Sequence, residues 1–150
     1  MNNTILKKNK QKGFTLIEVM VVVIILGILA AIVVPKIMSR PDEAKITKVK
    51  ADINNIESAL DLYKLDNGFY PSTTQGLQAL VSKPAGDPAP SNWHGYLKSL
   101  PIDPWGKPYH YANPGSHGET DIFTDGADNQ PGGTGINATM GNWNLDTIKI

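Results

Sequence analysis

One long apolar run dominates the first third of the chain. Between residues 14 and 34 the only polar side chains are Thr15 and Glu18, and none occurs from Val19 onward. As a helix, these 21 residues would span about 31 Å at about 1.5 Å each, which matches a hydrocarbon core of about 30 Å. The pattern therefore predicts a membrane-spanning helix.

The charges around this run predict its orientation. Four lysines precede it without any acidic residue, whereas Lys36 and Arg40 after it are balanced by Asp42 and Glu43. The positive-inside rule then places the amino end in the cytoplasm and the rest of the chain outside. A secretory signal cleaved after Ala31 is the alternative. However, the run is longer than a signal core and continues into a helical pattern, so retention as an anchor is favoured.

Glu18 is the unusual residue of the run. An acidic residue at the middle of a membrane helix costs about 2.5–3.5 kcal/mol, and less near the interface. One interpretation is that Glu18 reaches the headgroups and water. The other is that the chain is cut between Gly13 and Phe14, which would create an amine one helical turn before the carboxylate. Pairing within one helix or between two staggered helices would then satisfy Glu18, and buried pairs of this kind set register.

A second helical pattern follows the run. Pro35 is expected to end or bend the first helix and Pro41 to interrupt the chain again, while Ser39 is expected to cap a new helix. Apolar residues then recur every three or four positions, which predicts a helix over residues 42–66 that ends at Asn67-Gly68. This stripe comprises Ile46, Val49, Ile53, Ile56, Leu60 and Tyr63. It is expected to cover a small sheet, with a coiled-coil seam as the alternative.

The remaining chain predicts little regular structure. A short helix is expected within residues 71–81, and the proline-rich stretch 84–108 reads as an irregular wrap. Strand signals at 109–112, 120–124 and 142–148 predict a small antiparallel sheet. The expected fold class is therefore α+β: a long N-terminal helix, with a membrane half and an amphipathic half, packed on this sheet and followed by a C-terminal loop.

Composition excludes several classes of protein. Fourteen Lys and Arg cancel fourteen Asp and Glu, so no overall field attracts nucleic acid. The absence of cysteine excludes disulfides, thiol nucleophiles and zinc fingers. No hydrolase, zinc-protease or phosphate-loop motif occurs. His94, His110 and His117 read as surface residues, and the tryptophans read as packing residues rather than a sugar platform.

A glycine-rich acidic segment could hold a metal. Asp121, Asp125, Asp128, Asn129 and Asn137 lie in or beside it, and residues 119–146 contain no lysine or arginine. Hard oxygen ligands on a flexible loop suit calcium, but the spacing does not fit an EF-hand. Asp-Gly also occurs simply because it turns easily, so both interpretations stay open.

Several motifs carry a family resemblance. Residues 12–18 (Lys-Gly-Phe-Thr-Leu-Ile-Glu) before an apolar run resemble the class III signal of type IV pilins and type II secretion pseudopilins. Residues 61–71, 75–81, 100–106, 118–123 and the Gly-Asn-Trp at 141–143 are similar to the major pseudopilins of type II secretion. Type IV pilins usually close a C-terminal loop with a disulfide, so the absence of cysteine favours the pseudopilins.

The resemblance implies a type IV pilin-like fold and a processed chain. Residues 1–13 would be a leader cleaved after Gly13 by a prepilin peptidase, and the new Phe14 amine would be methylated. Residues 14–35 would be the transmembrane and filament-core helix, and 36–150 a periplasmic globular domain. Glu18 would pair with the Phe14 amine of a neighbouring subunit during assembly. Storage would be in the inner membrane, as a single-pass protein with a cytoplasmic N-terminus.

The implied function is structural rather than enzymatic. The chain would be the major subunit of a periplasmic pseudopilus, polymerising to drive export of folded proteins across the outer membrane. The implied partners are copies of itself, minor pseudopilins, the prepilin peptidase, an inner-membrane assembly platform and membrane lipid, with no nucleic acid. The alternatives are a type IV pilin acting in adhesion, motility or DNA uptake, and a membrane-anchored periplasmic enzyme or binding module.

The resemblance also implies a structural calcium ion in the loop before Gly-Asn-Trp. Asp128 matches the family's first ligating aspartate, and Asp125 would contribute through its backbone carbonyl. Where the family usually has acidic residues, this chain offers the neutral oxygens of Asn137 and Thr139, and Gln130 completes the expected set. Less charge around the ion implies weaker binding.

Overall fold

The computed structural model describes residues 13–38 and 40–148. The predicted leader therefore lies outside the described residues except for Gly13, and so does Ser39, the predicted cap. The chain divides into two compact units, one up to Met38 and one from Ser39 onward. Each unit is described by itself below.

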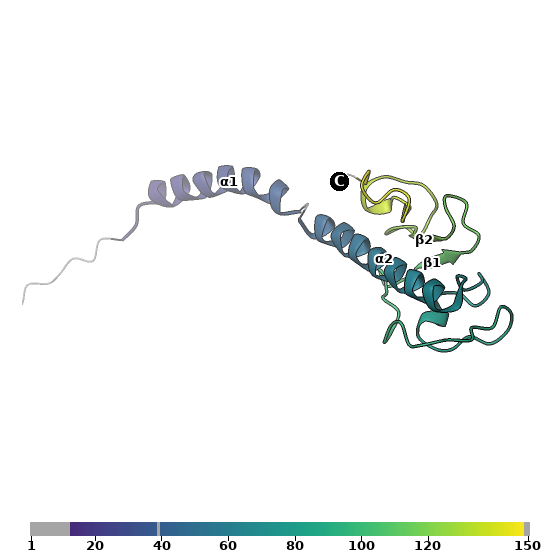
Figure 1. The fold of residues 1–150 in the computed structure, drawn as a ribbon. Coiled ribbons are helices and arrows are strands. Elements are labelled where there is room, and N and C mark those ends of the chain that lie inside the picture. Colours follow the sequence, from purple (N-terminus) through teal and green to yellow (C-terminus); the bar gives the residue numbers. More distant parts are fainter. Residues whose placement is uncertain (1–12, 39, 149–150) are drawn as a thin grey trace, which may run out of the picture. The chain divides into compact units, whose positions relative to one another are not determined.

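The first unit is built around helix α1, which runs from Leu16 to Met38 (Figure 1). The helix does not end at Pro35 but continues for three more residues. A proline removes only its own backbone donor, so the rest of the hydrogen-bond ladder can continue past it with a local bend. The boundary between the two helices consequently falls after Met38.

Helix α2, Arg40–Asn67, is the main helix of the second unit. It starts two residues earlier than expected because Pro41 lies in its first turn, where a proline's missing N–H has no helical partner to lose. Gly68 ends the helix as predicted: its φ is +84°, and its N–H donates to the carbonyl of Lys64 at 2.7 Å. The left-handed conformation that stops the helix suits glycine.

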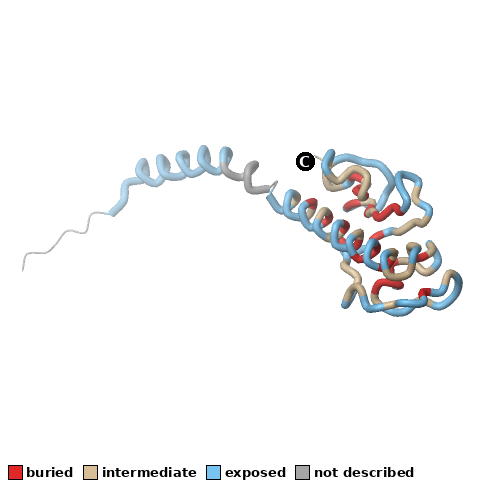
Figure 2. Tube along the Cα trace, viewed as in Figure 1, coloured by how far each residue is buried: buried red, intermediate tan, exposed pale blue. Residues whose placement is uncertain are grey.

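The predicted stripe of α2 is buried. Figure 2 shows the buried positions of α2 on the side that faces the rest of the unit. Five residues of the stripe, Val49, Ile53, Ile56, Leu60 and Tyr63, have no exposed surface. They share one core with Ile122 and Met140 of the sheet. The prediction that the stripe covers a small sheet is thus confirmed.

The sheet has three short antiparallel strands in the order β1-β2-β3. Strand β1 is His110–Ala112, β2 is Asp121–Thr124 and β3 is Met140–Gly141. Tyr111 pairs with Ile122, and Phe123 pairs with Gly141. Before the sheet, a 3-10 helix η1, Leu77–Leu80, takes the place of the expected short helix, and the proline-rich stretch is irregular as predicted.

The predicted third strand at 142–148 is wrong. These residues form turns, with the N–H of Asn144 donating to the carbonyl of Gly141 and that of Thr147 to the carbonyl of Asn144. The Asn142 side chain takes a strand's place at this edge, because its Oδ1 accepts from the N–H of Ile122 at 3.2 Å and its Nδ2 donates to the carbonyl of Thr120 at 3.0 Å. Side-chain bonds thus compete with a continued ladder.

Candidate functional site

The start of α1 is organised by a reciprocal cap. The Glu18 carboxylate accepts from the N–H of Thr15 at 2.9 Å and from its hydroxyl at 3.1 Å. The N–H of Glu18 in turn donates to the Thr15 hydroxyl at 3.3 Å. This is a capping box, and Thr-x-x-Glu before an apolar run is its sequence signature. This role of Thr15 was not predicted, although its Thr-x-x-Glu signature stands in the sequence.

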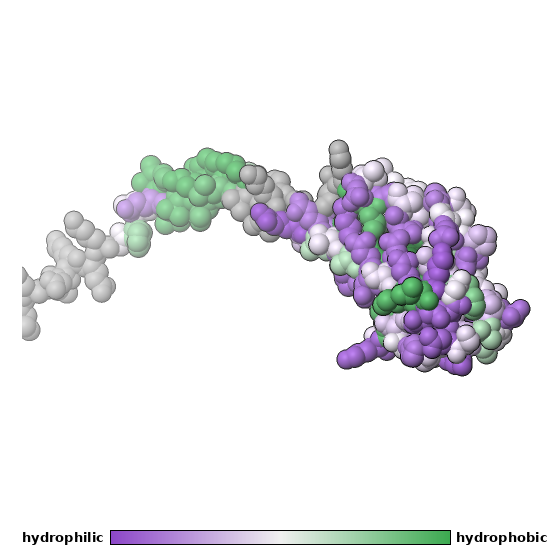
Figure 3. Space-filling view, in the orientation of Figure 1, coloured by the Kyte–Doolittle hydropathy of each residue, from purple (hydrophilic) through white to green (hydrophobic). Residues whose placement is uncertain are grey.

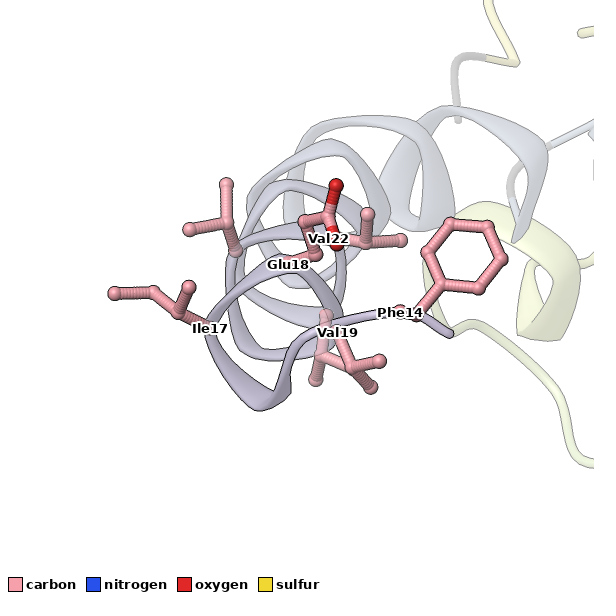
Figure 4. Close-up of a pocket in the computed structure, with 7 residues that line it drawn as sticks. Phe14, Ile17, Glu18, Val19 and Val22 are labelled. Atoms are coloured by element: carbon pink, nitrogen blue, oxygen red, sulfur yellow. The ribbon is translucent and has the colours of Figure 1, made fainter. Parts of the chain in front are cut away.

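The surroundings of Glu18 are otherwise apolar. Figure 4 shows its carboxylate at the start of α1 with Phe14, Ile17, Val19 and Val22 around it. Among the described residues, Glu18 has no ion-pair partner, so neutral donors alone satisfy it. A cation placed beside it would form a stronger, charge-assisted bond.

The rest of α1 presents apolar side chains to its surroundings all round. The exposed fraction of its large hydrophobic residues from Leu16 to Ile32 lies between 48% at Val21 and 80% at Leu16. Figure 3 shows the described part of α1 as a continuous hydrophobic surface. A helix that is apolar on every side requires an apolar environment or packing partners.

Within residues 13–38 and 40–148, no helix has the length and hydropathy needed to cross a membrane.

The loop of residues 125–139 contains the predicted metal ligands. The Thr139 hydroxyl donates to Asp125 Oδ1 at 2.8 Å, while it accepts from the N–H of Gly132 at 2.8 Å. Asp128 Oδ1 accepts from the N–H of Gln130 at 3.1 Å. The structure therefore joins the side chains of Asp125 and Thr139, and holds Asp128 in a local turn with the backbone of Gln130.

Close backbone contacts explain Gly126 of this loop. The N–H of Ala127 donates to the carbonyl of Ile136 at 2.8 Å, which ties the two arms of the loop together. Gly126 has a φ of +69°, and a Cβ at that position would stand 2.5 Å from the Ile136 carbonyl oxygen. Only glycine fits there without displacing the opposite arm, so Gly126 is a shape-determining residue that ligand chemistry alone did not reveal.

The donor set of the loop fits calcium by chemical class. Carboxylate, hydroxyl, amide and carbonyl oxygens are the hard ligands that calcium takes. In the described part of the chain, however, no three acidic, histidine or cysteine side chains come together. Asp125 is partly buried: its side chain is 13% exposed and lies 3.7 Å from His110 Nε2. Among the described residues, the side chain of Asn137 makes no hydrogen bond, and its predicted role remains a prediction.

Two family models match this chain in adjacent segments. The family described as "Type II secretion system (T2SS), protein G" covers residues 36–143, and "Prokaryotic N-terminal methylation motif" covers residues 8–34. The first match alone spans more than half of the chain. The chain belongs to the type II secretion pseudopilins.

Individual relatives agree with this assignment. The chain is 60% identical to the type II secretion system core protein G of Pseudomonas aeruginosa, over 92% of this chain and 99% of the relative. It is 55% identical to that of Vibrio cholerae, over 95% and 99%. The crystal structure of the major pseudopilin from enterohaemorrhagic Escherichia coli matches with a TM-score of 0.65 and 47% identity, covering 74% of this chain and 96% of that chain.

These matches decide several of the predictions above. The chain is a major pseudopilin with a pilin-like fold and is a structural protein rather than an enzyme. The alternatives of a type IV pilin and of a membrane-anchored enzyme are therefore set aside. Membership of the family together with the methylation motif implies polymerisation and peptidase processing.

The Gly-Asn-Trp motif of this pseudopilin joins the sheet to α2 and to the 116–121 turn. The Trp143 ring packs directly on Gly141, where a Cβ would overlap the indole, stacks on the His117 ring at 3.8 Å between centroids and meets the Phe123 ring edge-on. Asn142 Nδ2 donates to Glu57 of α2 at 3.3 Å. Trp93 and Trp105 pack against the hydrophobic core, as expected of the tryptophans, whereas Trp143 packs on the turn.

The Asp121 carboxylate is hydrogen-bonded to the backbone of the same turn. It accepts from the N–H groups of Ser116 and His117 at 2.8 Å and 3.2 Å, and lies 2.9 Å from His117 Nδ1. Burial acts to raise the pKa of Asp121. The hydrogen bonds from His117 and Ser116 outweigh that effect, so the pKa lies below its ordinary value of 3.8. Asp121 is therefore a structural carboxylate that is charged at neutral pH.

Proposed function

We propose that this pseudopilin is stored in the inner membrane through residues 14–35 and then polymerises into a periplasmic pseudopilus that drives export of folded proteins across the outer membrane. The observation that carries the proposal is the surface of α1: apolar on every side, with Glu18 as the single charged residue between Leu16 and Ile32. Lipid satisfies such a helix in storage, and neighbouring copies of α1 satisfy it in a filament.

Processing supplies the missing charge. Cleavage after Gly13 by a prepilin peptidase leaves an amine on Phe14, the predicted site of methylation, which stays a cation after one methyl group is added. The Glu18 carboxylate, held by Thr15 in the single chain, then exchanges its neutral partners for the Phe14 amine of an adjacent subunit. Charge-assisted hydrogen bonds are about twice as strong as neutral ones, so assembly is favoured over storage.

The partners follow from these steps. The lysine-rich amino end faces the cytoplasm and the globular unit faces the periplasm. The prepilin peptidase reads the leader, an inner-membrane assembly platform collects processed subunits, and minor pseudopilins share the filament. Neutral overall charge supports a role without nucleic acid.

A structural calcium ion in the 125–139 loop is the second part of the proposal. Asp128 would supply charge, Asp125 would supply its backbone carbonyl, and Gln130, Asn137 and Thr139 would supply neutral oxygens. When bound, the ion would cross-link the two arms of the loop and lower the entropy of this glycine-rich segment. The support for it is the oxygen-rich donor set and the existing Asp125–Thr139 contact.

The sharpest test of the assembly mechanism separates the cap from the charge of Glu18. Glu18→Gln keeps a residue that can complete a capping box but removes the negative charge. We expect Glu18→Gln and Glu18→Ala chains to be inserted in the inner membrane at normal levels, yet to form no pseudopilus and to abolish export. Immunoblotting of membrane fractions, sheared filaments and culture supernatant measures these three properties.

Thr15→Val is the matched control. It removes the hydroxyl of the cap, leaves the Glu18 charge intact and is expected to retain assembly with the amine still available. Normal filaments from Glu18→Gln would refute pairing with the Phe14 amine. Loss of assembly in Thr15→Val equal to that in Glu18→Gln would show that the cap is the essential role of Glu18.

A further inference from the structure

The globular unit leaves three large hydrophobic side chains mainly exposed. Among its described residues these are Leu62 (53%), Leu65 (79%) and Ile102 (57%). Leu62 and Leu65 lie three positions apart on α2, away from the stripe that faces the sheet, whereas Ile102 lies in the irregular stretch before β1. Figure 3 shows a mostly hydrophilic face on this unit with separate hydrophobic patches. The three side chains thus form two separate sites.

The leucine pair has acidic flanks. Asp61 and Asp66 lie on either side of it in the sequence; each accepts one tyrosine hydroxyl, from Tyr70 and Tyr96 at 2.9 Å. Lys64 does not neutralise them, because its ammonium is bound by both oxygens of Glu119 at 2.9–3.0 Å. The surface around Leu62 and Leu65 is therefore apolar with an acidic rim.

Two contacts hold the backbone of Ile102 in place. Its backbone pairs with Pro108 in an antiparallel bridge, and its carbonyl accepts from Lys48 Nζ of α2 at 2.7 Å. Beneath it, the buried Asp103 carboxylate accepts from the Lys107 N–H at 2.7 Å and from the Thr124 hydroxyl at 2.6 Å. The exposed isoleucine side chain is consequently held in place rather than carried on a loose loop.

The surroundings of Ile102 are basic. Lys48 pairs with Asp52 of its own helix, but Lys107, whose carbonyl accepts from the N–H of Asp103 at 2.8 Å, is exposed and makes no ion pair with the described residues. The rim of Ile102 therefore carries the opposite sign to that of the leucine pair. Complementary rims of this kind guide one surface onto another and fix register.

The two sites lie at different levels of the unit. Ile102 is attached beside Lys48, and 14 to 17 residues of α2 separate Lys48 from the leucine pair, which is about 21–26 Å along the helix at about 1.5 Å per residue. The sites cannot meet within one molecule. A contact between two different patches on identical copies is heterologous, and such contacts extend into open filaments.

We propose that in the filament Ile102 of one copy packs against Leu62 and Leu65 of the next copy, with the lysine rim of the first facing the aspartate rim of the second. This inference rests on the proposed polymerisation and adds to it a specific contact between globular units. It also supplies stagger between neighbouring subunits that is independent of the helix α1 and Glu18.

The absence of native cysteine allows a direct test by disulfide trapping. We expect the double variant Ile102→Cys with Leu65→Cys, produced in cells with the complete secretion apparatus, to give a ladder of dimers, trimers and larger species after mild oxidation. Each single variant gives none, because its cysteine meets no second cysteine. The double variant Ile102→Cys with Ser82→Cys, which pairs Ile102 with another exposed position, is the matched control and gives no ladder.

Two results would overturn the contact. Filaments that form normally from the Ile102→Cys, Leu65→Cys chain but give no ladder would refute it while leaving polymerisation intact. Dimers from a single variant would show a symmetric contact instead. Failure of the cysteine-free parent to form filaments would refute the proposed function itself, and is read separately by electron microscopy of sheared fibres.

A second measurement covers the energetic role of the contact. We expect Ile102→Ser and Leu65→Ser to leave the melting temperature of the detergent-solubilised full chain unchanged, since both side chains are exposed, and to reduce the yield of sheared filaments. Unchanged filament yield from both variants would contradict the proposal.

Discussion

At the scale of single residues, the Asp121 carboxylate makes the stability of this pseudopilin depend on pH. Asp121 is 4% exposed, and its hydrogen bonds from Ser116 and His117 require the charged form. Because the folded state lowers the pKa of Asp121 below 3.8, the folded state binds its proton less readily than the unfolded state does. Asp121 therefore stabilises the fold above its ordinary pKa, and this contribution is lost as the pH falls through the lower, folded-state pKa.

We expect the wild-type chain to lose stability faster than an Asp121→Asn chain as the pH falls from about 5, through the ordinary pKa of 3.8, to the lower folded-state pKa. At neutral pH the variant is the less stable of the two, because it lacks the charge that the three hydrogen-bond donors bind. Thermal melts of full-length protein in detergent across this pH range provide the measurement. Asp146→Asn, at an exposed acid in the last turn, should follow the wild-type curve. Equal pH slopes for wild type and Asp121→Asn would count against this role.

At the scale of elements, α2 has two faces with different tasks. The buried face from Ile46 to Tyr63 builds the core with β2 and β3, while the exposed face carries Leu62 and Leu65. The 125–139 loop differs from α2, because its described residues include no strand. Close contacts at its glycines and the Asp125–Thr139 hydrogen bond hold its shape. An ion that joins its two arms would stabilise the loop more than it would a preformed helix or strand.

The loop gives the element-scale prediction. We expect calcium to raise the melting temperature of the full-length chain in detergent and a chelator to reverse the effect. At about 100 times Kd the gain is about 2.7 kcal/mol, a shift on the order of 10 °C for a chain of this size. Asp128→Ala should abolish the response, whereas Asp146→Ala should keep it. A wild-type melting temperature that changes with neither calcium nor chelator would refute the proposed calcium site.

At the scale of the whole molecule, the proposed cleavage of the amino end controls the assembly of subunits into a filament. In the proposed mechanism, the lysines of residues 1–12 would hold the amino end at the cytoplasmic surface before cleavage, and Phe14 would offer no cation. Cleavage would remove this basic segment and leave a charged amine one turn before Glu18. The same event would therefore remove the cytoplasmic anchor and create the partner for assembly.

Mass spectrometry of subunits taken from sheared filaments checks this step. We expect a chain that begins at Phe14 and carries one additional methyl group on its amine, whereas a strain without the prepilin peptidase accumulates the intact chain and no filaments. Gly13→Ser, which changes the residue before the cut, serves as the variant in the chain itself and should remain uncleaved. Filament subunits that retain residue 13 would disprove the processing step.

Much of this pseudopilin was predictable because it depends on local order along the chain. The three-and-four spacing from Ile46 to Tyr63 predicted a buried helix face, and Asn67-Gly68 predicted its end, since both patterns act through backbone geometry within a few residues. The Thr15-x-x-Glu18 box belonged to the same class of local signals. Glycine at 126, by contrast, is explained only by the opposite arm of its loop ten residues later.

What the sequence determined by itself was the apolar run with its single acid, the length and buried face of α2, and the family to which the motifs point. Only the tertiary structure decided which side chains replace the backbone hydrogen bonds of a strand and which ones lie exposed on the surface. Residues 142–148 form turns because Asn142 bonds to β2 and α2, and the exposed Ile102 is positioned because Lys48 and Pro108 hold its backbone. These contacts join residues far apart in the chain, so no local pattern encodes them.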